Sequence, residues 1–207
     1  VPILNQATGV NSLLNYSVVL MQRAGLEGTM ANWADTVIKF ANLLFTCVAM
    51  ALVDRKGRRF LLTIGTAGVT LGLVVVGCLF LATERGWIGV RPLSGWGIVA
   101  AFVLFIGGFA VGPGVCVWIV MTELMPLRFR AGGLMVAQFL AMGASYTLAQ
   151  TFLPWSNAFG DSSVFLALSV FGLLYFLTVV VFLPETKGRT LEEVEQYFTT
   201  GKMPEKK

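Results

Sequence analysis

The sequence predicts an all-α membrane protein with six transmembrane helices. Of its 207 residues, 56% are hydrophobic and only 13% are charged, a balance typical of polytopic membrane proteins rather than soluble domains. Six apolar runs follow one another, and each is close to the roughly 20 residues that a helix needs to cross about 30 Å of hydrocarbon. The six runs are residues 1–20, 32–53, 60–83, 96–121, 131–153 and 163–183.

The composition argues against several classes of function. The chain has no histidine, so the commonest metal ligand and the usual titrating switch are missing. Its three cysteines, Cys47, Cys78 and Cys116, lie inside apolar runs and are expected to be small buried hydrophobic residues rather than disulfide partners. No nucleophile with a base, and no carboxylate pair, falls in a plausible pocket. We therefore predict no catalytic residue, metal or cofactor and no nucleic-acid partner.

The first run is already under way at Val1, so we expect the chain to be a piece of a longer protein. This run also carries many polar side chains. Amides against lipid would each cost roughly several kcal/mol, so these side chains should meet protein or a watery cavity. Contacts between helices are one interpretation, but so many on one face favour a solute path. On a helix, one face would carry Asn5, Thr8, Gly9, Ser12, Asn15 and Tyr16, with Gln6 and Asn11 flanking it on either side.

The second run contains a lysine and an amide three positions apart, Lys39 and Asn42. Asn42 can join the same cavity as the amides of the first run. Asp35 precedes Lys39 by four residues, the spacing at which a carboxylate pairs with an ammonium group on a helix. We expect this pairing, and the alternative is a charge that attracts an anionic solute.

Glycines are frequent in the third and fourth runs, where they allow helix backbones to approach closely. In the fourth run, Gly112, Pro113 and Gly114 also make the helix easy to bend or break, which indicates a moving part. Trp118 lies well inside the same run, where its indole could stack on a ring-shaped solute. In the fifth run, the polar residues are interpreted as helix contacts. They are Gln138, Ser145, Tyr146 and Gln150.

Lysine and arginine are distributed unevenly between the two sides of the predicted bundle. One side has eleven and the other has three, so the loops after the second and fourth helices and the C-terminal tail are predicted to be cytoplasmic. Residues 1–184 are expected to form the six-helix bundle. Residues 185–207 are expected to form a tail with a short amphipathic helix, which the capping box at Thr190 should start.

Four segments together resemble the sugar porter family of the major facilitator superfamily. They are residues 5–16, residues 54–59, the run Gly112-Pro113-Gly114 with Trp118, Glu123 and Arg130, and residues 184–190. The resemblance covers nearly the whole chain. It implies the C-terminal six-helix half of a twelve-helix transporter, whose partner would be the N-terminal half.

The resemblance also implies roles for individual residues. Sugar hydroxyls would be bound by Gln6, Asn11 and Asn42, with Asn5 beside them and the Trp118 indole beneath the sugar. Gating would involve Asn15, Tyr16, Gly112, Pro113 and Gly114. A cytoplasmic salt-bridge network would consist of Asp54, Arg55, Arg58, Glu123, Arg130 and Glu185.

We therefore predict a carrier in the plasma or inner membrane that moves a sugar or sugar-like polyol by alternating access, as a uniporter or proton symporter. Two alternatives stay open. One is a carrier of a charged organic solute, which Lys39 favours. The other is a nutrient sensor on the same fold that does not transport, because a fold does not fix a function.

Overall fold

Helices account for nearly all of the chain that the computed structural model describes. The described residues are 1–26, 28–87, 92–125 and 130–183, without the side chains of 54–56, 92–94, 123–124 and 182, and they contain no strand. The helices are α1 (Pro2–Ala7), α2 (Val10–Asn15), α3 (Ser17–Arg23), α4 (Thr29–Lys56), α5 (Arg58–Glu84), α6 (Pro92–Val111), α7 (Pro113–Leu124), α8 (Arg130–Phe159) and α9 (Asp161–Phe182). The predicted tail at 185–207 lies outside the described residues.

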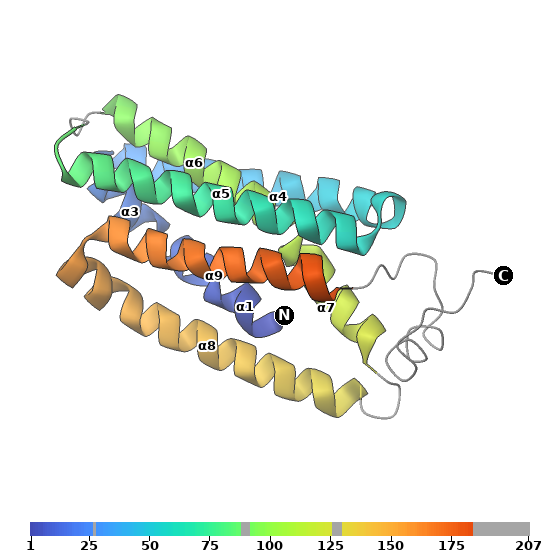
Figure 1. Ribbon diagram of the computed structural model, residues 1–207. Helices are drawn as coiled ribbons and strands as arrows, with labels where there is room; N and C mark the ends of the chain where they lie inside the picture. The colour runs from blue at the N-terminus through green and yellow to red at the C-terminus, as the bar shows by residue number, and fades with distance from the viewer. Residues whose placement is uncertain (27, 88–91, 126–129, 184–207) are drawn as a thin grey trace.

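Five stretches are long and apolar enough to cross a membrane, and they correspond to the second to sixth predicted runs. They are Thr29–Val53, Arg58–Glu84, Gly95–Thr122, Arg130–Phe159 and Asp161–Val181. The long helices run roughly along one common axis (Figure 1). The predicted all-α membrane fold is therefore confirmed.

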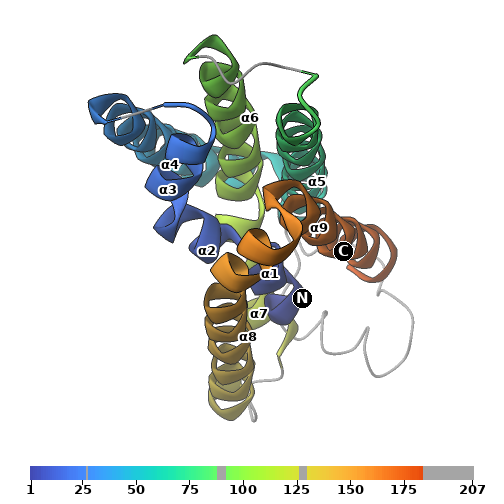
Figure 2. The same ribbon diagram turned by 90° about the vertical axis from the view of Figure 1, so that its left-hand side faces the viewer.

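The first run is not the single helix that we predicted, because it divides into α1, α2 and α3. The first break is at Gly9, whose φ of 79° lies in the left-handed region that glycine adopts without a steric cost. The second break is at Tyr16, whose φ of −100° and ψ of 9° are not helical. Hydropathy over about 20 residues does not locate these breaks, since it averages across all three short helices. Seen nearly end-on, the three short helices lie between α4 and α8 (Figure 2).

The fourth predicted run breaks at Gly112, between α6 and α7, as its glycines and proline indicated. Gly112 faces α5 so closely that a Cβ atom added to it would lie 2.4 Å from the Leu61 carbonyl oxygen. A Cβ atom added to Gly65 of α5 would lie 2.5 Å from the Gly112 Cα. The break is thus held against α5 by contacts that only glycine permits.

Replacing Gly65 by alanine is expected to destabilise the fold by about 1 to 3 kcal/mol, because the new methyl group meets backbone rather than a movable side chain. Thermal denaturation of the purified protein in detergent measures this change. Gly97→Ala is the matched control, since a Cβ atom at Gly97 of α6 meets nothing within 4 Å. Equal midpoints for the two variants would contradict the proposed close packing at Gly65.

Aromatic rings fill the centre of the bundle and fix the position of α8. Phe165 of α9 stacks on Phe80 of α5, with ring centroids 5.2 Å apart, and meets Phe102 of α6 edge-on at 5.8 Å. It also meets Phe152 of α8 edge-on at 6.4 Å. Tyr16, at the end of α2, stacks on Phe152 at 5.4 Å. These contacts hold α2 against α8.

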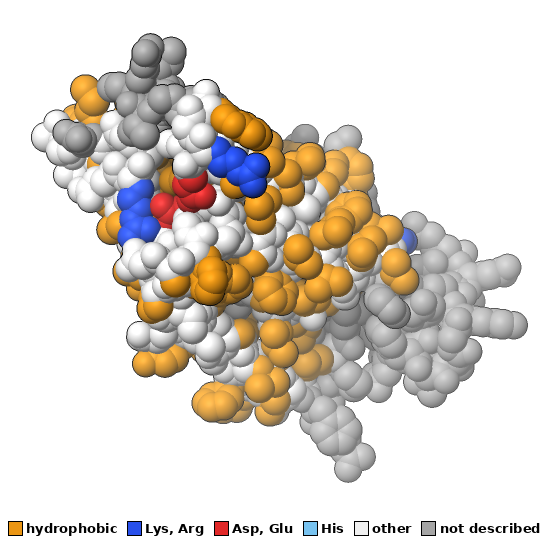
Figure 3. All heavy atoms as spheres, turned by 60° about the vertical axis from the view of Figure 1, so that its left-hand side comes forward, with side chains coloured by type: hydrophobic (Ala, Val, Ile, Leu, Met, Phe, Trp, Pro, Cys, Tyr) orange, Lys and Arg blue, Asp and Glu red, His pale blue; other side chains and the backbone are white. Residues whose placement is uncertain are grey.

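Charged side chains gather at the end of the molecule where α3 ends and α9 begins (Figure 3). Arg23 donates to the Asp161 carboxylate at 2.9 Å, to the Asn157 side-chain oxygen at 2.7 Å and to Ser156. On the neighbouring α5, the Glu84 carboxylate accepts hydrogen bonds from the backbone and hydroxyl of Ser162. The ends of α3, α5, α8 and α9 are therefore joined.

The cysteine prediction was right for one residue and wrong for two. Cys116 is buried, whereas Cys47 on α4 and Cys78 on α5 are exposed. A membrane helix is apolar on all sides, so an apolar sequence context does not tell which face turns inward.

Candidate functional site

Two amide side chains from the first run are hydrogen-bonded to each other, and one of them also contacts a hydroxyl of α8. The Asn11 amide nitrogen donates to the Gln6 side-chain oxygen at 2.7 Å and to the Ser145 hydroxyl at 3.2 Å. Asn11 is exposed, and its own side-chain oxygen accepts no hydrogen bond from any described residue, so it can accept one from a solute. We call Gln6, Asn11 and Ser145 the amide cluster.

The break at Gly9 produces this arrangement. On one continuous helix, Gln6 and Asn11 would lie about 140° apart, at about 100° per residue, and we predicted them on either side of a polar face. The left-handed glycine turns α2 relative to α1 and brings the two amides into contact. It also packs tightly, since a Cβ atom at Gly9 would lie 2.8 Å from Leu168 of α9.

The polar face that we predicted for the first run turns into the bundle only as far as Ser12. Thr8 and Ser12 are buried together with Asn5, whereas Asn15 is exposed. Thr8 donates its hydroxyl to the Asn5 backbone oxygen at 2.7 Å, and the Asn5 side-chain oxygen is buried without a hydrogen-bond partner in the structure. Asn5 thus lies inside the bundle, next in sequence to the amide cluster, with an acceptor that nothing in the described chain satisfies.

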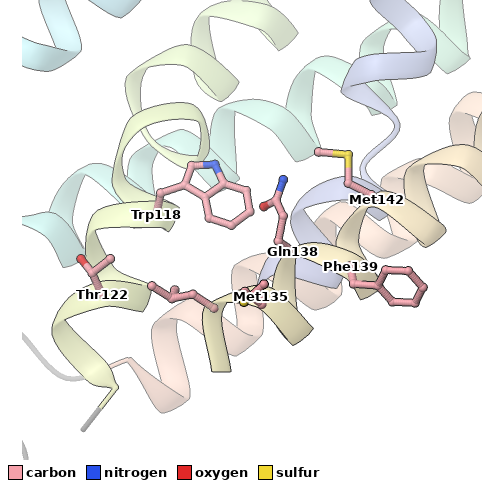
Figure 4. A pocket seen from close by; sticks show the side chains of 7 residues that line it. Trp118, Thr122, Met135, Gln138, Phe139 and Met142 are labelled. Carbon is pink, nitrogen blue, oxygen red and sulfur yellow. The ribbon is translucent and has the colours of Figure 1, made fainter. Parts of the chain in front are cut away.

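Trp118 lines an open pocket of about 620 Å³ between α7 and α8. Figure 4 shows its indole pointing across the pocket toward the side chain of Gln138 on α8. Thr122 of α7 and several apolar side chains of α8, among them Met135 and Met142, complete the lining. Trp118 therefore lines a cavity, and its stacking on a solute stays a prediction.

Ser145 and Gln138 of α8 were both interpreted as helix contacts. Ser145 makes such a contact, since it accepts a hydrogen bond from Asn11 of α2, whereas Gln138 faces Trp118 across the pocket. Their spacing of seven residues places them on one face of the helix, and that signal was present in the sequence.

Asn42 lies half-buried on α4, and its side chain makes no hydrogen bond with the amide cluster within the described part of the chain. One turn before it, the predicted pairing is confirmed, since the Lys39 ammonium group lies 2.7 Å from the Asp35 carboxylate. The same carboxylate accepts a hydrogen bond from Ser17 of α3. Asp35 therefore joins α3 to α4.

The residues predicted to act in gating lie at the breaks between helices. Tyr16 donates its hydroxyl to the Ala149 carbonyl oxygen of α8 at 3.2 Å, and neighbouring Asn15 is exposed. Gly112 and Pro113 are buried where α6 meets α7, and Gly114 is half-buried. Whether these breaks move stays a prediction.

Most of the predicted cytoplasmic salt-bridge network falls outside the described side chains. Asp54, Arg55, Glu123 and Glu185 are in this group. Of the two arginines that are described, Arg130 donates to the Met125 carbonyl oxygen at 3.3 Å, and Arg58 is half-buried at the start of α5. The network itself stays a prediction. Within the described residues, no group of three or more acidic or cysteine side chains could hold a metal ion.

The fold and the sequence comparisons together place this chain in a family. Helices of this length and hydropathy define an integral membrane protein that crosses the bilayer several times. A family model described as "Sugar (and other) transporter" matches residues 1–198. The chain belongs to this family, the sugar porters of the major facilitator superfamily, and corresponds to one half of that fold.

Several of the similar proteins are named as sugar carriers. The chain is 29% identical to the galactose-proton symporter of Escherichia coli K12, over 97% of the chain and 42% of that protein. It is 31% identical to the facilitated trehalose transporter Tret1 of Anopheles gambiae, over 92% of the chain and 24% of that protein. The inward-open xylose transporter XylE from E. coli superimposes with a TM-score of 0.79 at 26% identity, covering 94% of this chain and 40% of XylE. The chain thus spans less than half the length of these relatives.

Proposed function

We propose that this chain forms half of a membrane carrier that binds a neutral sugar or polyol and moves it by alternating access between two six-helix bundles. The observation that carries the proposal is the amide cluster. In it, Asn11 donates to Gln6 and Ser145 and keeps its side-chain oxygen free as an acceptor. The similar proteins, named for trehalose, galactose and xylose, support a sugar as the solute.

The chemistry of the site suits an uncharged polyol. An amide has both donors and an acceptor, as a sugar hydroxyl does, so one amide can bind two adjacent hydroxyls. The indole of Trp118 offers an apolar face to the C–H groups of a sugar ring. Lys39, the cation that could attract a charged solute, is already paired with Asp35. A charged solute is therefore the weaker candidate, and no enzymatic reaction is proposed.

Uptake by the complete carrier in proteoliposomes tests the proposal. Tritiated galactose, xylose and trehalose are the probes, because the similar proteins are named for these sugars. Saturable uptake of at least one sugar, with no competition from gluconate, is the expected result. Binding without uptake would favour a sensor, and competition by gluconate would favour a carrier of charged solutes.

Energy coupling is expected to be independent of Asp35. Apart from Asp35, no aspartate or glutamate lies within the six predicted apolar runs, and a proton symporter needs a group that changes protonation during its cycle. Asp35 is held by Lys39 and Ser17, which gives it a structural role. If uptake depends on a pH gradient, we expect that dependence to survive in Asp35→Asn.

The measurement is uptake by Asp35→Asn with and without a pH gradient. The double variant Asp35→Asn/Lys39→Gln is the control, because it removes the ammonium group that the single variant leaves unpaired. A gradient dependence that disappears in both variants, while passive exchange of sugar persists, would show that Asp35 carries the proton.

A further inference from the structure

Gln138 is a polar side chain in a pocket whose other α8 side chains are apolar. Its amide makes no hydrogen bond with any part of the chain that the structure describes, although it is half-buried. Thr122, the other polar residue in the lining, donates its hydroxyl to the Ile119 carbonyl oxygen at 2.7 Å and is satisfied. The amide of Gln138 therefore keeps its donors and its acceptor available to a molecule that enters the pocket.

The position of Gln138 on α8 relates it to the amide cluster. Gln138, Met142 and Ser145 follow one another at spacings of four and three residues, so they share one face of the helix. Gln138 and Ser145 are about 10 Å apart along the axis, at 1.5 Å per residue. This face of α8 therefore contacts Asn11 at Ser145 and lines the Trp118 pocket at Met142 and Gln138.

We propose that Gln138 binds the transported solute together with Trp118, as a second polar contact point two helical turns from the amide cluster. This proposal rests on the proposed function, a carrier of a neutral sugar or polyol. The amide of Gln138 supplies a donor and an acceptor for hydroxyls at the edge of a ring whose face lies on the indole (Figure 4). Gln138 then determines which solutes are accepted, since a solute without a hydroxyl there leaves the amide unpaired.

The test compares Gln138→Ala with wild type in the complete carrier, by equilibrium binding and by uptake of tritiated galactose, xylose and trehalose. For the solute that binds wild type best, we expect an affinity roughly 3- to 10-fold lower, as loss of one hydrogen bond predicts. KM for uptake should rise, and the maximal rate should change little, because the amide acts in binding. Gln138→Asn, which keeps the amide on a shorter side chain, should recover part of the loss.

Gln150→Ala is the matched control, because Gln150 is exposed on the same helix but twelve residues further along, on a different face. If Gln138→Ala binds all three sugars as tightly as Gln150→Ala does, the assignment is overturned while the proposed function stands. A change in the inward and outward populations without a change in affinity would also overturn it, by indicating a contact with the other half of the carrier. Failure of wild type to bind any of the three sugars would overturn the proposed function and this assignment with it.

Discussion

Replacing Asn11 by alanine is expected to lower the sugar affinity of the complete carrier by roughly 5- to 150-fold, which corresponds to about 1 to 3 kcal/mol. The side chain donates to Gln6 and Ser145 and keeps its own oxygen free for a hydroxyl. Alanine at this position removes the contact with the solute. It also removes the hydrogen bonds that hold the side chains of Gln6 and Ser145 in place. Equilibrium binding of the transported sugar measures the loss.

Asn32→Ala serves as the control for Asn11→Ala, because Asn32 is an exposed asparagine near the start of α4, away from the amide cluster. We expect wild-type affinity for this control and normal membrane insertion for both variants. Affinity that is unchanged in Asn11→Ala would remove the amide cluster from the solute site.

Replacing Trp118 by alanine is expected to reduce affinity by a similar factor, roughly 5- to 150-fold, because the solute loses the aromatic face on which its ring lies. Trp118 also packs against a buried cluster that includes Val117 and Val120, so alanine will lower stability as well. Trp118→Phe keeps an aromatic face and should retain most of the binding. Measuring affinity and thermal stability for both variants separates the two effects.

Trp33→Ala is the matched tryptophan control, because the Trp33 side chain is 67% exposed near the start of α4. We expect it to bind sugar as wild type does. If Trp118→Ala lost stability but bound sugar with wild-type affinity, Trp118 would belong to the bundle interior and not to the solute site.

The sequence predicted the long helices well because hydropathy over about 20 residues is a strong signal. It predicted the break at Gly112 from local glycine and proline, and the Asp35–Lys39 pair from a spacing of four residues. These are properties of one segment at a time. They do not require knowing how segments pack.

The first run was harder to predict because one backbone angle decides it. A lone glycine in an apolar run is usually tolerated within a helix, and nothing in the pattern around Gly9 indicates a φ of 79°. That angle brings the side chains of Gln6 and Asn11 into contact.

One hydrogen-bond partner of Asn11, Ser145, comes from α8, more than 130 residues further along the chain. Ser145 and Gln138 looked like ordinary helix contacts because a single helix does not show what stands opposite its polar face. Packing of α8 against α1 and α7 supplies that information, and it places Gln138 in the pocket lined by Trp118.

We claim that the solute lies between the first run, α7 and α8, and protection of a single cysteine from labelling is the test. In the complete carrier, with Cys47, Cys78 and Cys116 and any cysteine elsewhere in the protein replaced, Ser145→Cys places one thiol beside Asn11. A water-soluble maleimide should label this thiol, and the transported sugar should slow the labelling at concentrations near its KM, whereas a sugar that is not transported should not. Labelling at the same rate with and without the transported sugar would contradict the claim.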